Sequence, residues 1–457
     1  MRGVRLIFHS RLPIQILSAE FLFLLAIGGP ALPANTAAHG RMKVANSAGA
    51  GARLTSDVSG SIPAHDGRSL HLVTNLGNII IHSQDSEKVG YQVHLEVSAT
   101  QKNPRELLKD FKVSARETPE GVSLRGQAGR ESAGRLWVTF RIDVPRNYSL
   151  DVSTGGGSIE TDDVNGRAVL STSGGSITTG NIAGSARLET DGGHITVKNV
   201  SGDLTANTGG GHITAGAIGG NASLNTSGGH IRVASVGGIA HLTTGGGNIS
   251  LGHSGSGLVA ETAGGQIEVG EAAGLVRAKT GGGGIHVVRA SGPADLQTVG
   301  GSIYLTQVDS AVTASTAAGG ITAWFGDPSK HPGNCDLQSN DGDIVVYLPQ
   351  NLPVTIDAQI RMADEHRFIL DPAFPLQVSY ADSTNGSRTV RAAGSLNGGG
   401  ELLRLRAIAG NIHLILSNAS EQQHIYNMQM QELERQIRSQ LHRLEQLQQA
   451  DGGLFLP

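Results

Sequence analysis

Hydrophobic and polar positions along the centre of this chain repeat with a period of 18 residues. An isoleucine recurs at that spacing ten times in one register. A glycine stands two residues before each isoleucine, and a threonine stands five residues before it. A fixed period of this length is typical of a solenoid, in which every repeat forms one coil. The repeat positions are Ile159, Ile177, Ile195, Ile213, Ile231, Ile249, Ile267, Ile285, Ile303 and Ile321.

Alternation within each repeat predicts β-strands rather than helices. In one repeat, Leu188 and Thr190 fall on one face of a first strand, and Ile195 and Val197 fall on one face of a second strand, so all four are predicted to point inward. The glycine pair before each isoleucine predicts a corner, because glycine tolerates positive φ. Residues 150–348 are therefore predicted to form an all-β, parallel β-solenoid with 18-residue coils.

The threonine column is expected to lie inside the solenoid. A buried hydroxyl needs a hydrogen-bond partner. The equivalent threonine of the next coil would lie about 4.8 Å away along the stack. The sequence therefore predicts a ladder of threonine hydroxyls that bond to one another between coils.

The segments outside the repeats divide by composition. Arg2 and Arg5 precede a short apolar run at 21–27 and a set of small residues, which is typical of a secretory signal peptide. Residues 39–66 are rich in Ala, Gly and Ser and show no periodicity. The predicted organisation is a signal peptide at 1–38, a flexible linker at 39–66, N-terminal strands and cap at 67–149, the solenoid at 150–348, C-terminal strands and cap at 349–417, an amphipathic helix at 418–450 and a tail at 451–457.

Isolated copies of the repeat spacing stand within both predicted caps. Thr74, Gly77 and Ile79 repeat the threonine, glycine and isoleucine spacing before the main array, and Gly410 and Ile412 repeat part of it afterwards. We expect a degenerate coil at each end, with further strands that hide the exposed strand edges.

The composition changes abruptly in the predicted helix at 418–450, where Gln, Glu, Arg and Leu dominate. Apolar residues at spacings of three and four predict an amphipathic helix. One interpretation packs this stripe on the solenoid of the same chain. The other is a short coiled coil that makes a homo-oligomer. The stripe consists of Tyr426, Met430, Leu433, Ile437, Leu444 and Leu447.

Three motifs, together with the Gly-Gly-x-Ile coils, resemble the bacterial "putative adhesin" family of β-strand-repeat proteins. The motifs are LVTNLGNI at 72–79, RIDVPRNYSLDVSTGGGSI at 141–159 and DGDIVVYLP at 341–349. The resemblance covers roughly residues 67–417. It implies the repeat fold and, through the family name, surface adhesion. The motifs carry no known catalytic residues, so the resemblance implies no site.

Charge limits the classes of partner, and the cysteine count limits the possible disulfides and metal sites. The net charge is −4 and only 16% of the residues are charged, which does not favour nucleic acid or an anionic membrane surface as a partner. The single cysteine, Cys335, excludes an intramolecular disulfide and a thiolate metal cluster. We expect no cofactor and, after removal of the signal peptide, no integral membrane span.

The position before each repeat isoleucine is predicted to point outward. In three successive coils it holds His194, His212 and His230, which should stack at about 4.8 Å. Such a column suits Zn²⁺ or Cu²⁺, or a response to pH, because imidazole binds these metals and titrates near neutral pH. The competing interpretation is an ordinary solvated stripe that drifts between Ser, His, Asn and Gln.

Carboxylates cluster in the first coil at Glu160, Asp162 and Asp163, so an enzyme that acts on polysaccharides is an alternative. Coils of 18 residues leave little room for the long loops that usually build such sites. We therefore predict an exported, non-enzymatic rod, adhesin-like or structural, that binds glycans or proteins at the cell envelope. Its location would be the periplasm, the outer surface or the extracellular space. The alternatives are the polysaccharide-acting enzyme and a metal- or pH-responsive histidine-ladder protein.

Overall fold

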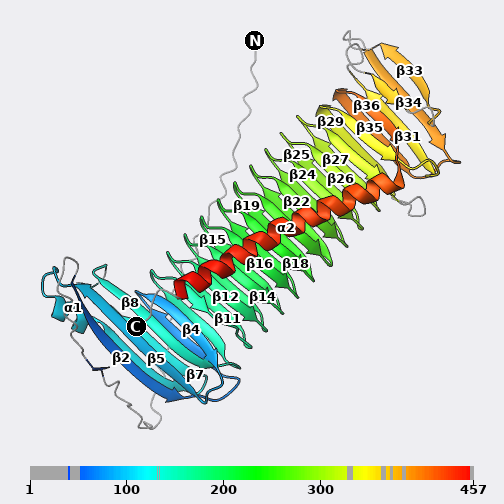
Figure 1. Ribbon diagram of the computed structural model, residues 1–457. Helices are drawn as coiled ribbons and strands as arrows, with labels where there is room; N and C mark the ends of the chain where they lie inside the picture. Colours follow the sequence, from blue (N-terminus) through cyan, green and yellow to red (C-terminus); the bar gives the residue numbers. More distant parts are fainter. Residues whose placement is uncertain are drawn as a thin grey trace, which may run out of the picture. The chain divides into compact units, whose positions relative to one another are not determined.

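The computed structural model describes residues 40–41, 52–130, 132, 134–326, 333–361, 367–370, 374–382 and 388–452. The predicted signal peptide at 1–38 lies outside the described residues. The described part of the chain forms a parallel β-solenoid with two long sheets and a C-terminal helix (Figure 1), which confirms the predicted fold class.

Each regular coil contributes one strand to each sheet. Sheet B holds the first strand of each coil, and sheet A holds the second. The strands of sheet B in the array are β9 (Ser149–Thr154), β11 (Ala168–Thr172), β13 (Ala186–Thr190), β15 (Leu204–Thr208), β17 (Ala222–Thr226), β19 (Ile239–Thr244), β21 (Gly257–Thr262), β23 (Val276–Thr280), β25 (Ala294–Thr298), β27 (Val312–Thr316) and β29 (Cys335–Asp341). Those of sheet A are β10 (Ile159–Thr161), β12 (Ile177–Ile182), β14 (Ile195–Val200), β16 (Ile213–Ile218), β18 (Ile231–Val236), β20 (Ile249–Ser254), β22 (Ile267–Ala272), β24 (Ile285–Ala290), β26 (Ile303–Val308), β28 (Ile321–Phe325) and β30 (Ile344–Leu348).

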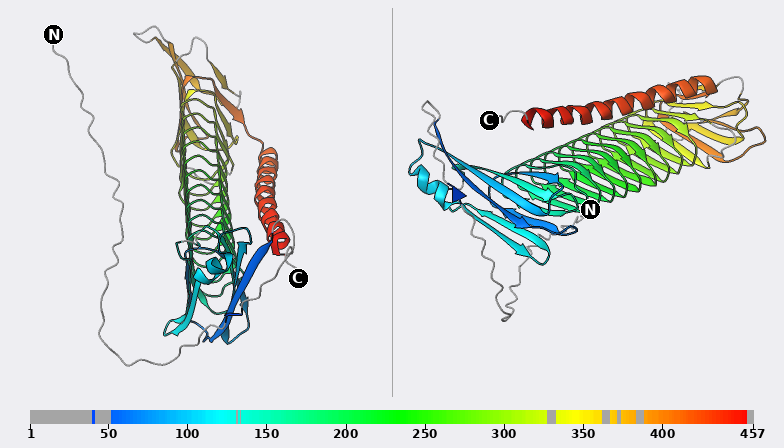
Figure 2. Two further views of the ribbon diagram at one scale, coloured as in Figure 1. Left: turned by 90° about the vertical axis from the view of Figure 1, so that its left-hand side faces the viewer. Right: turned by 60° about the horizontal axis from the view of Figure 1, so that its bottom comes forward.

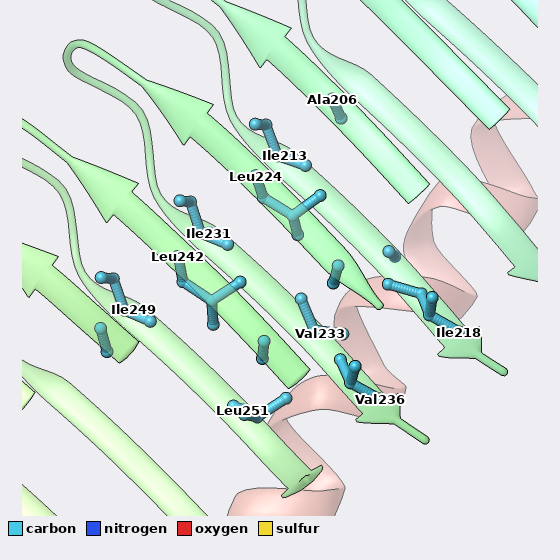
Figure 3. Close-up of a cluster of buried hydrophobic side chains, with 14 of the residues drawn as sticks. Ala206, Ile213, Ile218, Leu224, Ile231, Val233, Val236, Leu242, Ile249 and Leu251 are labelled. Atoms are coloured by element: carbon cyan, nitrogen blue, oxygen red, sulfur yellow. The ribbon is translucent and has the colours of Figure 1, made fainter. Parts of the chain in front are cut away.

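The register of the sheets follows the sequence period. Strands pair in parallel with each isoleucine opposite the next, as in Ile213, Ile231 and Ile249. All ten repeat isoleucines are completely buried. Figure 3 shows Ile213, Ile231 and Ile249 in one line, with Leu224 and Leu242 of the facing sheet beside them. The core is therefore a set of aliphatic columns between the two sheets, and each coil buries its apolar face against its neighbours.

The glycines at the corners before the isoleucines are required by crowding, and the expectation of positive φ is wrong in the regular coils. Among the described residues of this column, positive φ occurs only near the ends of the array, at Gly77 and Gly342. In a regular coil, a Cβ added to Gly229 would lie 1.9 Å from the carbonyl oxygen of Gly211 in the preceding coil. Glycine is needed because successive coils touch backbone to backbone at this point.

The threonine column is buried as predicted, but the predicted threonine-to-threonine ladder is wrong. The Thr226 hydroxyl donates to the carbonyl oxygen of Gly211 at 2.8 Å and accepts from the backbone N–H of Gly229 at 3.1 Å. Thr190 likewise donates to the carbonyl oxygen of Gly175 at 2.8 Å. Each hydroxyl thus joins two coils through the glycine backbone, because the close corner presents a carbonyl oxygen nearer than the next threonine.

The first degenerate coil forms as predicted, but at the N-terminal end the order of the coils in space differs from their order in the sequence. β3 (Ser69–Thr74) pairs with β9, and β4 (Asn78–Gln84) pairs with β10, in the register that sets Thr74 opposite Thr154 and Ile79 opposite Ile159. The chain then leaves the array, and β7 (Gly121–Gln127) and β8 (Leu136–Pro145) return to pair in parallel on the far side of β3 and β4. The coil nearest the array is therefore covered by residues that come later in the sequence.

Antiparallel strands close this end, and one of them corrects the predicted linker. Part of 39–66 forms β2 (Arg53–Pro63), which pairs with β5 (Lys88–Ser98) along its whole length. The sequence hid this strand because an end strand is held mainly by the backbone ladder of its neighbour and needs few apolar residues. The remaining elements here are β1 (Gly40–Arg41), α1 (Pro104–Asp110) and β6 (Lys112–Thr118).

The C-terminal end repeats the same arrangement. The predicted last coil consists of β35 (Leu402–Ala409) and β36 (Ile412–Leu416), which pair with β29 and β30 and set Ile412 opposite Ile344. β31 (Val354–Ile360) and β32 (Phe368–Leu370) lie beyond it, although they come earlier in the sequence. Antiparallel strands β34 (Arg388–Leu396) and β33 (Gln377–Asp382) end sheet B.

Cys335 begins β29 and is buried, and burial raises the pKa of its thiol to about 11. A thiol with such a pKa is uncharged at neutral pH and is a poor nucleophile. The last described element is α2 (Ala419–Gly452), which lies along the coils (Figure 2).

Candidate functional site

The outer face of sheet A is covered by α2. The helix contacts the sheet A strands from β16 to β26. The residue three positions after each repeat isoleucine points outward from sheet A. At Asp162 and Lys198, in coils before β16, this residue is exposed. Beneath the helix the same column is small or uncharged and buried, which leaves room for the helix to approach. The buried positions are Gly216, Gly252, Gly270, Val288 and Thr306.

Apolar side chains of α2 fill the space above the glycines. Leu433 and Ile437 are buried, and their methyl groups would lie 3.2 Å and 3.5 Å from Cβ atoms built on Gly270 and Gly252. The structure therefore shows the first of the two predicted arrangements, in which the stripe packs on the same chain. Oligomerisation through 418–450 stays a prediction.

Polar contacts fix the N-terminal half of the helix. The Gln422 side-chain amide donates to the carbonyl oxygen of Thr306 at 3.1 Å, and the Tyr426 hydroxyl donates to Glu271. Burial, followed by this bond to Glu271, raises the pKa of Tyr426. The helix position is thus specified by directional bonds as well as by apolar contact. The absence of charged residues such as Asp162 and Lys198 from the outward column beneath the helix was the sequence signal for this seam, although Gly180 shows that one small residue alone does not mark it.

The three histidines stack on one another as predicted. The rings of His194 and His212 have centroids 5.0 Å apart and planes 10° apart. Those of His212 and His230 have centroids 4.9 Å apart and planes 13° apart. Nδ1 of His194 accepts from the backbone N–H of His212 at 2.9 Å, and Nδ1 of His212 accepts from that of His230 at 2.9 Å. A neutral ring with an accepting Nδ1 carries its proton on Nε2.

Other residues in the same column make the same bond. Oγ of Ser158 accepts from the backbone N–H of Ser176, and Oγ of Ser176 accepts from that of His194, at 3.2 and 3.1 Å. Oδ1 of Asn248 accepts from the backbone N–H of Gln266 at 3.0 Å. The column therefore selects short side chains with an acceptor that reaches the corner N–H of the next coil. This hydrogen-bonding role explains why the column holds Ser, His and Asn in different coils, and it requires no bound ligand.

The stack disfavours protonation. Burial lowers the pKa of His212, and the neighbouring His230, His194 and Arg232 lower it further. Burial and then Arg232 lower the pKa of His230. A proton added to Nδ1 would also displace the hydrogen bond that this atom accepts. The structure of the corner therefore favours the neutral form of these histidines.

The geometry of the stack does not suit one shared metal ion. Two imidazole nitrogens bound to the same Zn²⁺ lie at most about 4.2 Å apart, since each Zn–N bond is about 2.1 Å. The rings here are nearly parallel with centroids 4.9 and 5.0 Å apart. Within the described ranges, no group of three His, Cys, Asp or Glu side chains is placed to hold a metal. Metal binding by His194, His212 and His230 stays a prediction that this conformation does not favour.

The acidic cluster of the first coil supports the backbone. Oδ2 of Asp162 lies 3.0 Å from Nδ1 of His82. Oδ1 of Asp163 accepts from the backbone N–H of Asn181 at 2.7 Å and from its side-chain amide at 3.0 Å. Burial acts to raise the pKa of Asp163, but the two bonds from Asn181, together with the charges of Lys198 and Arg146, outweigh it and the pKa lies below the usual range. A carboxylate of this kind is a poor general acid.

The outer face of sheet B carries two columns of side chains that are partly or fully exposed. Strand pairing places each side chain opposite its equivalent in the next coil, so members of a column repeat at about 4.8 Å. The first column is Ser153, Ser171, Glu189, Asn207, Asn225, Thr243, Glu261, Lys279, Gln297 and Ser315. The second is Asp151, Val169, Arg187, Thr205, Ser223, His241, Val259, Arg277, Asp295 and Thr313.

Neighbouring members of these columns already interact. Arg187 and Glu189 form an ion pair at 2.5 Å, and the Gln297 amide donates to Asp295 at 3.0 Å. Neither column contains Phe, Tyr or Trp. We call these two columns together the sheet B ladder.

These features define a class: a parallel β-solenoid with one face closed by its own C-terminal helix and the other open as a repeated polar ladder. In the described residues, no helix combines the length and apolar character needed to cross a membrane. The sequence matches no protein-family model and no curated protein.

Similar solved structures include chains described as adhesion proteins. One is a "putative cell adhesion protein" from Clostridium sporogenes, with 7% identity and a TM-score of 0.16 over 79% of this chain and 100% of that chain. A "putative adhesin" from Bacteroides fragilis has 11% identity and a TM-score of 0.18 over 79% and 97%. Another, from Parabacteroides distasonis, has 11% identity and a TM-score of 0.23 over 64% and 94%. Identities and scores this low do not establish a shared family.

Proposed function

We propose that this chain is an exported, non-enzymatic binding protein that holds an extended glycan along the sheet B ladder. The observation that carries the proposal is the ladder itself, an open face in strict register on which every side chain except Val169 and Val259 can form hydrogen bonds. Its side chains are short and mostly uncharged, such as Asn207, Asn225 and Thr243. A polymer of sugar units presents repeated hydroxyls that can both donate to and accept from such groups.

A glycan fits this face better than a folded protein does. Protein interfaces are enriched in aromatic residues and Arg at their centres. The sheet B ladder has no Phe, Tyr or Trp. Its arginines, Arg187 and Arg277, already lie beside carboxylates of Glu189 and Asp295. The ladder therefore offers many weak polar contacts rather than a few strong apolar ones.

Repetition is what makes weak contacts useful. A net hydrogen bond contributes about 0.7 kcal/mol, which multiplies an affinity about threefold. A longer ligand reaches more coils without repeating the full entropic cost of association. The affinity should thus rise steeply with the length of the glycan until the ligand spans the ladder.

The test is a glycan-array screen on the mature protein, followed by calorimetry with a length series of the best glycan. The double variant Asn207→Ala and Asn225→Ala should weaken binding about tenfold, because it removes two adjacent contacts. Lys198→Ala, on the outer face of sheet A, is the matched control and should leave the affinity unchanged. An affinity that does not depend on glycan length, or capture of proteins but no glycans, would contradict the proposal.

Two companion measurements address export and catalysis. N-terminal sequencing of the protein recovered from cell fractions should find the mature chain starting between about residues 31 and 39, outside the cytoplasm. Incubation with the bound glycan should release no new reducing ends. Chain cleavage would support the polysaccharide-acting alternative instead.

A further inference from the structure

The seam between α2 and sheet A contains a pocket of about 250 Å³. Val288 of the solenoid and Met428 and Leu433 of the helix form apolar parts of its wall, and Glu268, His286 and Glu432 supply polar groups. A cavity of about 150 Å³ holds benzene. This pocket therefore has room for one aromatic ring with a short aliphatic chain.

The charged residues that line the pocket are both acidic, although Glu432 is paired with Arg435 at 2.5 Å and Glu268 interacts with the charge of Arg232. Two lining residues, Glu268 and Glu432, are acidic, and no lysine or arginine lines it. Burial lowers the pKa of His286, so the imidazole adds no positive charge at neutral pH. Bonds from Gln436 and Arg435 lower the pKa of Glu432, which keeps that carboxylate ionised.

One of the two carboxylates is held in place by the solenoid. The Gln266 amide donates to Oε1 of Glu268 at 3.1 Å, and the Ser250 hydroxyl donates to Oε2 at 3.4 Å. A carboxylate oxygen accepts more than one hydrogen bond, so each still has capacity for a donor. The negative group is fixed before any ligand arrives, which reduces the ordering cost of binding.

Two large side chains near the pocket are exposed, and a bound ligand would cover part of their apolar surface. Met428, which lines the pocket, is 56% exposed, and Tyr304, whose ring lies edge-on to that of His286 at 6.3 Å, is 47% exposed. Large apolar groups gathered beside a concave site are typical of ligand binding. Methionine also adapts its shape to different apolar ligands.

We propose that the pocket under α2 binds a small organic amine, a protonated nitrogen on an apolar body about the size of a phenyl ring. The ammonium group binds Glu268, and the apolar body lies against Val288, Met428 and Leu433. Glu432, which is already paired with Arg435, adds negative charge at the edge of the pocket. Because both α2 and sheet A form the wall, the bound amine also strengthens the attachment of the helix. The site is separate from the sheet B ladder and does not depend on glycan binding.

The experiment uses the full mature chain and three probes of equal size: 2-phenylethylamine, 2-phenylethanol and phenylacetate. Calorimetry and saturation-transfer NMR should show the amine binding at least tenfold more tightly than the alcohol, and the acid most weakly. Glu268→Gln should remove the preference for the amine. Glu434→Gln, at an exposed position of the same helix that does not line the pocket, is the control and should keep it.

Other outcomes are equally decisive. If Glu268→Gln impairs folding, Glu432→Gln, at an exposed helix position that also lines the pocket, should weaken the preference for the amine. A chain that ends at residue 417 should bind none of the probes. Equal binding of amine and alcohol by the parent, binding by the truncated chain, or no binding at all would each overturn the proposal.

Discussion

The crowded corner of the coil predicts opposite effects for two adjacent glycines. Gly228 and Gly229 share one turn, and neither has positive φ. A Cβ added to Gly228 meets nothing within 4 Å, whereas one added to Gly229 lies 1.9 Å from the carbonyl oxygen of Gly211. Gly229→Ala should therefore destabilise the solenoid strongly, and Gly228→Ala should not.

The magnitude follows from the displacement that the new methyl group demands. An ordinary contact begins at 3.4 Å, so the two coils would have to separate locally by about 1.5 Å. Overpacking of this kind costs about 2 kcal/mol. The same carbonyl oxygen accepts the hydrogen bond from Thr226 at 2.8 Å, and losing it adds about 1 kcal/mol. We expect a total loss near 3 kcal/mol for Gly229→Ala, against a gain of about 0.5 kcal/mol for Gly228→Ala through reduced freedom of the unfolded chain.

Urea unfolding followed by circular dichroism, with amide hydrogen exchange on the same samples, measures the difference. Solenoids can unfold in stages, so exchange in the coils that contain Gly211 and Gly229 is the more local readout. Gly229→Ala should accelerate exchange there, and Gly228→Ala should leave it unchanged or slower. Equal behaviour of the two variants would refute the argument that backbone contact between coils requires this glycine.

Three further predictions concern the core, the corner and the helix. Ile231→Asp buries an unpaired carboxylate between coils and should lower the free energy of unfolding by more than 4 kcal/mol in calorimetry; an unchanged melting temperature would count against the aliphatic column. Thr226→Val should cost about 2 kcal/mol, because it leaves the Gly211 carbonyl and the Gly229 N–H unpaired, while exposed Thr243→Val should be nearly neutral. Removal of residues 418–457 should leave the solenoid folded with a lower melting temperature, and light scattering before and after the deletion decides whether the segment also joins chains.

The histidine stack gives a pH-dependent prediction with a defined sign. The pKa of folded His212 lies below its unfolded value near 6.5, so the unfolded chain binds more protons in that range. The contribution of the stack to stability is complete above pH 6.5 and is lost as the pH falls through the lowered pKa. His212→Asn retains a short acceptor, as at Asn248, and melting curves at pH 7.5 and 5 should show a smaller loss for this variant than for the parent. An unchanged pH dependence in the variant would place the titration elsewhere.

The period of the sequence was sufficient to predict the array and one coil in each cap. Ile79 and Ile412 were placed correctly because every coil of the stack packs on its neighbours in the same way. Residues that match the repeat spacing therefore indicate which residues they pair with. The details of the corner were harder to predict. The threonine hydroxyls and Nδ1 of His212 bond to backbone groups that the corner leaves unpaired. The periodicity of the side chains does not indicate which backbone groups these are.

Elements held by contacts outside the repeat were also hard to predict. β2 owes its place to the ladder of β5, so its own composition resembles that of a linker. The pocket under α2 arises where two segments distant in sequence meet, and no local pattern around Glu268 and Glu432 indicates it. The small outward residues at Gly252 and Gly270 were a readable signal of the covered face, because the same column holds Lys198 elsewhere.

The docking of α2 restricts how this gene can evolve. Successive turns of the helix place Ile437 over Gly252 and Leu433 over Gly270, one coil apart. Duplication or loss of an 18-residue unit between these two glycines would break that match, since the helix cannot stretch. Duplication of units between 164 and 200, outside the stretch from Gly252 to Gly270, would keep this match. Relatives of different size should therefore vary in that stretch and keep a constant number of repeats beneath the helix.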